Sequence, residues 1–224
     1  MIATTPNLFQ VRVKDTYGSP YAYAIGYTPL TDRKDFVPDS MKEREEQFTR
    51  INRFKPGIRI DKEKRLWPDF LYNGGGYVSF FVSGKVLEDI RSAGIEILDA
   101  TEFPIECIQG RSRLKLEDAP RYYVLEALPE LYPDWNKMGV PTSDDGKPLL
   151  PLPKPSPPKP FLYRNDTWTG RDLVSDARIT HWLFCNQTFI ALAVSRGWTN
   201  VEFEPVGSFR INIDTEQVMP PNGP

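Results

Sequence analysis

Apolar and polar side chains alternate near the start of the chain. Phe9, Val11 and Val13 would lie on one side of an extended segment, while the residues between them are polar. A repeat of two is typical of a strand that buries one face. We therefore expect residues 9–13 to form an edge or outer strand of a sheet.

A strand, a capped helix and a further strand are predicted in the middle of the chain. Residues 77–82 are apolar and β-prone, and Ser83 offers a side-chain oxygen that can cap a helix. Apolar residues recur at helical spacing over 86–93. Gly94 follows, and a glycine just past the last turn can take the left-handed conformation that ends a helix. Residues 95–98 predict the second strand.

The same order recurs in the second half of the chain. Residues 181–185 are β-prone, Asn186 is a candidate cap, and Gly197 follows an apolar stripe over 189–194. Residues 201–204 alternate apolar and acidic, as a strand with one face on the core should. In both units the cap and the glycine are eleven positions apart. Two interpretations stay open: the units are related, or both are chance examples of a common αβ element.

A charge-rich segment covers residues 41–65. Nine Lys and Arg residues against five Asp and Glu residues leave it a local charge of +4. This segment is either a patch for an acidic partner or a solvated helix whose opposite charges support each other at helical spacing. We favour the solvated helix.

Proline dominates residues 148–160, where it fills seven of thirteen positions. Proline fixes an extended backbone and donates no amide hydrogen bond, so this segment cannot join the interior of a sheet. We expect a semi-rigid strap between the two units. Its Pro-x-x-Pro spacings leave open a second interpretation, in which an aromatic groove of a partner binds the strap.

The whole pattern predicts an α+β fold, with a mixed or antiparallel sheet, a few short helices and the Pro-rich strap. The chain is expected to form one compact domain or two packed lobes. Its expected segments are a β-containing N-terminal segment with a charged helix or loop (1–76), a first strand–helix–strand unit (77–147), the strap (148–160), a second strand–helix–strand unit (161–219) and a disordered tail (220–224).

Composition excludes several classes of protein. The 224 residues include 28 Lys and Arg against 30 Asp and Glu, which gives a net charge of −2. A dedicated nucleic-acid binder needs a surplus of basic residues, so no nucleic-acid partner is expected. No apolar run approaches the ~20 residues that cross a membrane, so no membrane partner is expected either. The first residues lack the pattern of a secretory signal, and we expect a cytoplasmic protein.

Histidine and cysteine are too sparse for the commonest catalytic and metal sites. His181 is the single histidine, and Cys185 lies four positions beyond it. On one strand the two side chains would be roughly 13 Å apart, whereas proton transfer needs about 3 Å. The only other cysteine is Cys107, and no Cys-x-x-Cys spacing occurs. We expect His181 to be a packed strand residue and predict neither a metal nor a cofactor.

Two further candidate sites give weaker signals. The triple glycine at 74–76 precedes a Gly-Lys pair, but Ser79 and Val86 occupy positions that a phosphate-binding loop reserves for Gly and for Ser or Thr. The carboxylates of Asp166, Asp172 and Asp176 fall close together in the sequence. They are either a site for acid–base catalysis or, beside several turn-forming residues, ordinary turn chemistry.

Aromatic residues in polar, loop-like surroundings are the remaining candidates for function. Large rings beside Arg are the residue types that contribute most to protein interfaces, although many such rings belong to the core. Trp168 lies beside charged residues in a turn-rich segment and could project from the fold or fill the core. The candidate partner-binding residues are Trp67, Tyr72, Trp135, Trp168, Arg171 and Asp172.

Residues 168–206 carry a resemblance to a known family. The motif Trp-Thr-Gly-Arg-Asp-Leu at 168–173, Leu-Phe-Cys at 183–185 and Gly-Trp-Thr-Asn-Val-Glu-Phe-Glu-Pro-Val at 197–206 resemble the C-terminal part of bacterial immunity proteins of polymorphic toxin systems. The nearest group is the family first described from a myxobacterial immunity protein, formerly a domain of unknown function. Residues 77–128 are similar in the order of their elements, and the first 70 residues match no family we can name.

The resemblance implies a non-enzymatic cytoplasmic protein that binds and neutralises a cognate toxin encoded beside it, during competition between bacteria. Looser relatives bind zinc through Cys-x-x-Cys pairs. This chain lacks such pairs, so the resemblance implies no metal site here. Two alternatives stay open: an enzyme with a carboxylate-based site near Asp166–Asp176, and a scaffold recruited through the Pro-x-x-Pro strap.

Overall fold

The structure is a computed structural model, and it describes most of the chain in separate stretches. The described residues are 7–14, 21–25, 57–59, 66–73, 80–103, 105, 107–109, 114–144, 159–160, 162–164, 166–176, 179–206, 210–212 and 217–219.

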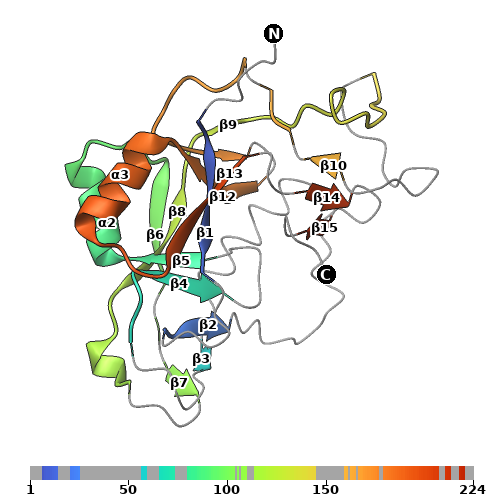
Figure 1. Cartoon of the computed structure of the whole chain (residues 1–224). Coiled ribbons are helices and arrows are strands. Elements are labelled where there is room, and N and C mark those ends of the chain that lie inside the picture. Colours follow the sequence, from blue (N-terminus) through green and yellow to red (C-terminus); the bar gives the residue numbers. More distant parts are fainter. Residues whose placement is uncertain are drawn as a thin grey trace.

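Short strands predominate among these residues, together with two α-helices and one 3₁₀ turn (Figure 1). The helices are α2 (Gly84–Ser92) and α3 (Gln187–Arg196), and the 3₁₀ turn is η2 (Leu116–Asp118). The strands are β1 (Phe9–Val13), β2 (Tyr23–Ile25), β3 (Gly57–Arg59), β4 (Phe70–Asn73), β5 (Phe80–Ser83), β6 (Asp99–Phe103), β7 (Cys107–Gln109), β8 (Tyr122–Glu126), β9 (Pro129–Leu131), β10 (Lys159–Pro160), β11 (Leu173–Asp176), β12 (Ile179–Cys185), β13 (Val201–Pro205), β14 (Arg210–Asn212) and β15 (Gln217–Met219).

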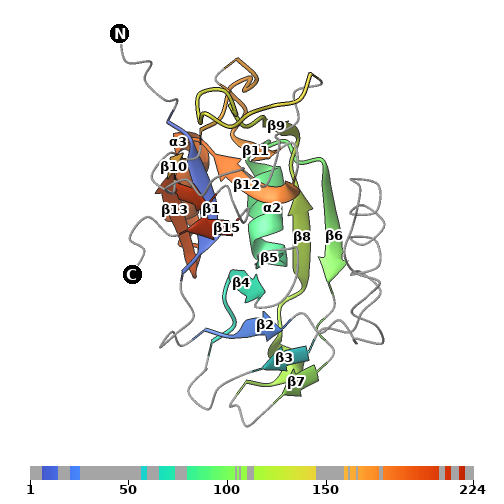
Figure 2. The same cartoon turned by 90° about the vertical axis from the view of Figure 1, so that its right-hand side faces the viewer.

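The strands form three sheets. A five-stranded sheet has the order β13-β1-β12-β11-β9, a seven-stranded sheet has the order β6-β8-β5-β4-β2-β3-β7, and a three-stranded sheet has the order β10-β14-β15. Most neighbours are antiparallel, but β2 with β4, β3 with β7 and β9 with β11 are parallel. Figures 1 and 2 show β2, β3 and β7 extending from β4 at one end of the molecule. The predicted α+β fold with a mixed sheet is confirmed.

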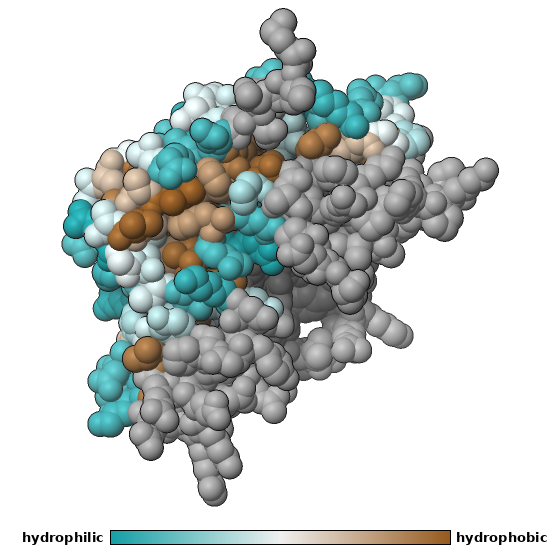
Figure 3. All heavy atoms as spheres, viewed as in Figure 1, coloured by the Kyte–Doolittle hydropathy of each residue, from teal (hydrophilic) through white to brown (hydrophobic). Residues whose placement is uncertain are grey.

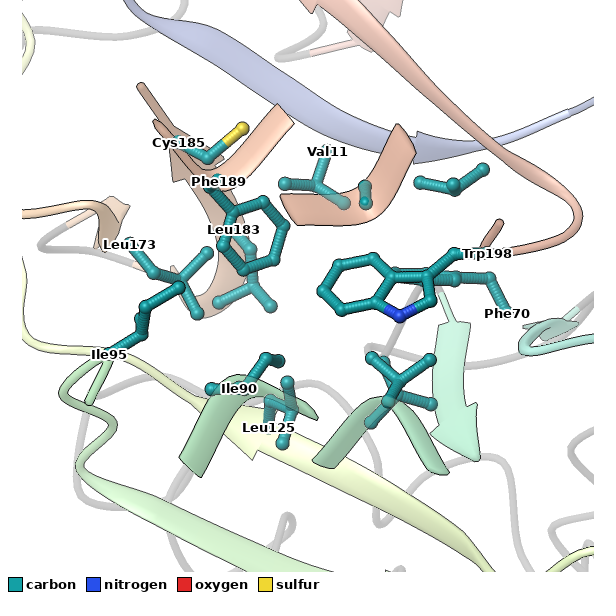
Figure 4. Packing of buried hydrophobic residues seen from close by; sticks show 14 of the residues in the cluster. Val11, Phe70, Ile90, Ile95, Leu125, Leu173, Leu183, Cys185, Phe189 and Trp198 are labelled. Carbon is teal, nitrogen blue, oxygen red and sulfur yellow. The ribbon is translucent and has the colours of Figure 1, made fainter. Parts of the chain in front are cut away.

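One hydrophobic core joins the two larger sheets and both helices. It contains Phe70 of the seven-stranded sheet, Leu183 of the five-stranded sheet, Ile90 of α2 and Phe189 of α3. Trp198, just after α3, contacts the rings of both Phe70 and Phe189, with ring centroids 5.8 and 5.4 Å apart. Figure 4 shows these side chains packed into one shared interior, with Ile90 entering it from α2. Burial of this shared apolar surface therefore holds the two sheets together.

Both helices begin and end where the sequence predicts. The Ser83 side chain accepts a hydrogen bond from the amide of Val86, and the Asn186 side chain accepts from the amides of Thr188 and Phe189. These bonds satisfy amides that have no partner within the helix. Gly94 and Gly197 have φ values of 71° and 63°, the left-handed conformation that closes a helix.

Three local predictions are wrong. Residues 9–13 form β1 in the interior of a sheet, between β13 and β12, because alternation reveals the buried face but not the number of neighbouring strands. The strand after α2 begins at Asp99 instead of Ile95, whose side chain turns into the core after the helix closes. Residues 57–59 are strand β3, so the solvated helix predicted for 41–65 does not extend over them.

Several other predictions concern residues outside the described stretches. The triple glycine at 74–76, the tail at 220–224 and most of the strap lie there. The last two residues of the strap, Lys159 and Pro160, form β10 at the edge of the three-stranded sheet, where a proline can be accommodated. The predicted boundaries of the segments stay a prediction. In the described part of the chain, neither helix has the length and apolar character needed to cross a membrane.

Candidate functional site

Arg171 lies at the centre of a cluster of charged and polar side chains. Its Nε donates to Glu96 Oε2 at 3.1 Å, and its Nη1 donates to Glu130 Oε1 at 2.8 Å. Glu96 follows α2, Glu130 is on β9, and Arg171 precedes β11, so three separate parts of the fold build the cluster. Two carboxylates on one guanidinium fix its orientation more firmly than one would.

A tight turn at residues 168–171 presents this arginine. The indole N–H of Trp168 donates to the backbone carbonyl of Arg171 at 3.1 Å, and Gly170 between them has a φ of 93°. The backbone amide and the hydroxyl of Thr169 bond to Glu130 at 2.9 and 2.8 Å. The turn is therefore anchored to β9 from both the backbone and the side chains.

An exposed aromatic residue follows the strand that carries Glu130. Tyr132 lies directly after β9, two residues beyond Glu130, and is 47% exposed. Its backbone carbonyl accepts a 2.8 Å hydrogen bond from the amide of Arg164, which holds this segment in place. We call the set Glu96, Glu130, Tyr132, Thr169 and Arg171 the Arg171 surface.

Two ion pairs adjoin Tyr132. Arg164 and Asp166 are 2.7 Å apart, and Lys137 and Asp134 are 2.8 Å apart. The bond from Arg164 lowers the pKa of Asp166. Burial alone would raise the pKa of Asp134, but its hydrogen bonds from Lys137 outweigh burial and lower it. The bond to Glu96, supported by the charges of both glutamates, raises the pKa of Arg171. Asp134, Asp166 and Arg171 are therefore ionised at neutral pH.

Of the predicted partner-binding residues, three lie at or under this surface. Arg171 is part of it, and its side chain is 36% exposed. Trp168 is partly buried and packs on a second core cluster, to which the buried Trp135 also belongs. Of the two possibilities considered for Trp168, the structure favours packing on the core, while the turn that it begins presents Arg171.

The structure places the other three predicted residues elsewhere. Asp172 accepts a 2.7 Å hydrogen bond from the side-chain amide of Asn186, the cap of α3. Trp67 is partly buried against a third core cluster that includes Leu71 and Phe81. Tyr72 lies on β4 and is 37% exposed. Asp172 directly follows Arg171 in the chain, but its side chain bonds to Asn186, and no hydrogen bond or ion pair among the described residues joins Trp67 or Tyr72 to the Arg171 surface.

The three carboxylates considered for catalysis each have a different partner. Asp166 pairs with Arg164, Asp172 bonds to Asn186, and the fully buried Asp176 accepts a 2.9 Å hydrogen bond from the hydroxyl of Tyr163. Among the described residues, no group of three or more His, Cys, Asp and Glu side chains could hold a metal ion. Burial raises the pKa of the Cys185 thiol, which keeps it protonated.

Helix α3 shows a feature that sequence reasoning did not single out. Val194 is 74% exposed, and the neighbouring Ala191 is also exposed. Figure 3 shows hydrophobic residues gathered on this face of the molecule, over α3 and the strands beside it. The outer positions of α2 carry Lys85, Glu88 and Arg91 instead.

The two glutamates that hold Arg171 were also missed. Glu96 and Glu130 are 75 and 41 residues away from Arg171 in the sequence, and nothing local to either glutamate signals an ion pair. Arg171 meets these glutamates only after distant parts of the chain have folded together. A local residue pattern does not contain that information. No protein-family model matches the chain, and no curated protein matches it.

Proposed function

We propose that this protein is an immunity protein that neutralises a cognate bacterial toxin by binding it directly. The observation that carries this proposal is the Arg171 surface, in which a charge-paired arginine is bound to β9 and an exposed tyrosine directly follows that strand. Arg and Tyr are the residue types enriched at interface hot spots. Arg171 and Thr169 also belong to the 168–173 motif that resembles immunity proteins.

Fixed geometry makes this surface suited to binding. Ordering a long, free side chain costs about 0.5–1.5 kcal/mol on association, and the two glutamates have already ordered Arg171. Nε and Nη1 make the bonds to the glutamates, while Nη2 makes no hydrogen bond with any described residue. The planar guanidinium can therefore direct Nη2 toward a carbonyl or carboxylate of the toxin.

The charges of the surface indicate the kind of contact. Glu96, Glu130 and Arg171 together carry a net charge of −1, and the side chain of Glu96 is 61% exposed. A toxin that places a basic residue against Glu96 and an acceptor against Arg171 would match this arrangement. Binding should consequently weaken as the salt concentration rises.

A titration against the product of the neighbouring gene tests the proposal. We expect the wild-type protein to form a 1:1 complex and to rescue cells that express the toxin. Arg171→Ala and Tyr132→Ala should each weaken binding by at least about thirtyfold, the cost of losing an interface anchor of about 2 kcal/mol. Arg121→Ala is the matched control, because this arginine is well exposed and lies 4.0 Å from Glu102.

The possible results distinguish the proposed immunity function from the proposed position of the binding surface. No detectable binding by the wild-type protein would contradict the immunity function. Tight binding that both substitutions leave unchanged would contradict only the use of the Arg171 surface. In that case Val194→Asp tests the exposed face of α3, since a charge placed in an apolar contact abolishes it.

A further inference from the structure

We infer that the chain is a fused pseudo-dimer: two copies of one structural unit that exchange a strand with each other. The first unit consists of β4, β5, α2 and β6, and the second consists of β11, β12, α3 and β13. In each unit the first two strands form an antiparallel pair, the helix follows, and one further strand separates the second strand from the third. That inserted strand is β8 in the first unit and β1 in the second.

The strand pairs of the two units match residue by residue. Phe70 pairs with Val82 in the first unit, and Leu173 pairs with Cys185 in the second, 103 positions later. The next two pairs repeat at the same offset, as an antiparallel ladder requires once its first pair is set.

The helix caps Ser83 and Asn186 and the left-handed glycines Gly94 and Gly197 are also 103 positions apart. A common αβ element would reproduce the order of elements, but it does not require strand pairs, caps and glycines to share one offset. This shared offset is therefore stronger evidence for relatedness than the topology.

The entry to each helix repeats at the same offset. Ser83 donates its backbone amide to the carbonyl of Asp69 at 2.8 Å, and Asn186 donates to Asp172 at 3.1 Å. The side chains repeat the contact, because Ser83 Oγ bonds to Asp69 Oδ1 and Asn186 Nδ2 bonds to Asp172 Oδ1. Each unit thus has an aspartate that precedes its first strand and supports its helix cap.

The exit from each helix repeats as well. The amide of Ile95 donates to the carbonyl of Ile90 at 3.1 Å, and the amide of Trp198 donates to Ala193 at 3.0 Å. The side chains of Ile95 and Trp198 both turn into the shared core after a left-handed glycine. This is the hydrophobic contact that accompanies a helix closed by glycine.

The inserted strands occupy the same place although they lie in different parts of the chain. Tyr123 of β8 lies opposite Val82 on one side and Glu102 on the other. Phe9 of β1 lies opposite Cys185 and Pro205, the residues 103 positions after those two. Strand β1 therefore belongs structurally to the second unit, even though it precedes the first.

The strand that follows each inserted strand crosses to the other unit. β9 comes after β8 and pairs in parallel with β11, while β2 comes after β1 and pairs in parallel with β4. The partner residues Tyr72 and Ser175 are again 103 positions apart. Each sheet is thus extended by a strand from the other unit, which interlocks the two.

Contacts between the units fall at corresponding places. Two residues after the helix-closing glycine of the second unit, Thr199 donates its backbone amide to Asp69 of the first at 3.0 Å. At the equivalent place in the first unit, Glu96 accepts from Arg171, which directly precedes Asp172, the residue equivalent to Asp69. The partner is thus shifted by one residue and the bond differs, but in both directions the segment after a helix reaches the residues just before the first strand of the other unit. The Thr199 contact is part-buried and the Glu96 contact is exposed.

A circular permutant of the full chain tests the inference. Residue 224 is joined to residue 1 through a flexible linker, and the new ends are placed within residues 145–158, between the units. In this permutant β1 comes after β13 in the chain, just as β8 comes after β6. The strands and helix of each unit, with its inserted strand, are then continuous in sequence. We expect a single unfolding transition with a melting temperature within about 5 °C of that of the natural order. A second linker of twice the length guards against failure caused by the linker alone.

A matched permutant uses the same linkers but opens the chain between Gly94 and Asp99, which separates α2 from β6 inside the first unit. We expect its melting temperature to fall by at least about 10 °C or its cooperative transition to disappear. Equal stability of the two permutants, or loss of folding in the first with both linkers, would overturn the inference.

Discussion

Asp172 accepts a 2.7 Å hydrogen bond from the side-chain amide of Asn186, whose oxygen in turn caps α3. The bond fixes which way the Asn186 amide points, since its nitrogen faces the carboxylate and its oxygen faces the helix. Asp172→Ala should therefore lower the free energy of unfolding by about 1 kcal/mol, measured by chemical denaturation. Asn186→Ala should cost a similar amount, and the double variant little more than either alone. Additive losses would contradict this coupling.

Two glycines provide a matched test of backbone strain. Gly94 and Gly197 have φ values of 71° and 63°, and a β-carbon at either position would meet nothing within 4 Å. Alanine therefore introduces no clash, and only the left-handed backbone conformation disfavours it. We expect Gly94→Ala and Gly197→Ala each to destabilise the protein by about 1–2 kcal/mol, which thermal melts would detect. Ser92→Ala, at the exposed last residue of α2, is the control and should have little effect.

The parts of the fold that depend on neighbouring residues could be predicted from the sequence. Ser83, Asn186, Gly94 and Gly197 act on amides and carbonyls within four residues, so a local pattern contains the information. The interior position of β1 could not be predicted, because its partners β12 and β13 lie more than 160 residues away. Separation in sequence also hid the glutamates of Arg171, which are 75 and 41 residues away from it. The turn-rich surroundings of Trp168 are local and could be recognised, but the sequence left open whether its ring projects from the fold or packs on the core, because the cluster it joins is formed by distant residues.

The ion pair between Asp134 and Lys137 predicts a dependence of stability on pH. The pKa of Asp134 is lowered in the folded protein, so the carboxylate stabilises the fold above its unfolded pKa of about 3.9. This contribution is lost as the pH falls through the lower folded pKa. The melting temperature of Asp134→Asn should therefore lie below that of the wild type at pH 7, and the gap should close toward pH 3. The exposed Asp144→Asn is the control, and a gap that widens at low pH would contradict the assignment.

The bond from Trp168 to Arg171 predicts a measurable coupling between the two residues. Trp168→Phe keeps an aromatic ring on the core cluster but removes the indole N–H that donates to the Arg171 carbonyl at 3.1 Å. We expect it to destabilise the protein by about 1 kcal/mol, the usual contribution of one such hydrogen bond. Arg171→Ala removes the side-chain bonds to both glutamates while leaving the carbonyl in place.

If the turn at 168–171 acts as one unit, the two substitutions will not be additive. Loss of the indole hydrogen bond loosens the turn, so the guanidinium of Arg171 contacts Glu130 less often in the Trp168→Phe variant. Arg171→Ala should therefore lower the free energy of unfolding by less in that variant than in the wild type. Chemical denaturation of the two single variants and the double variant should give a coupling of at least about 0.5 kcal/mol. Trp67→Phe combined with Arg171→Ala is the matched control, since Trp67 packs in a different cluster from Trp168 and should show no coupling. Additivity in both cycles would mean that Trp168 fills the core without positioning Arg171.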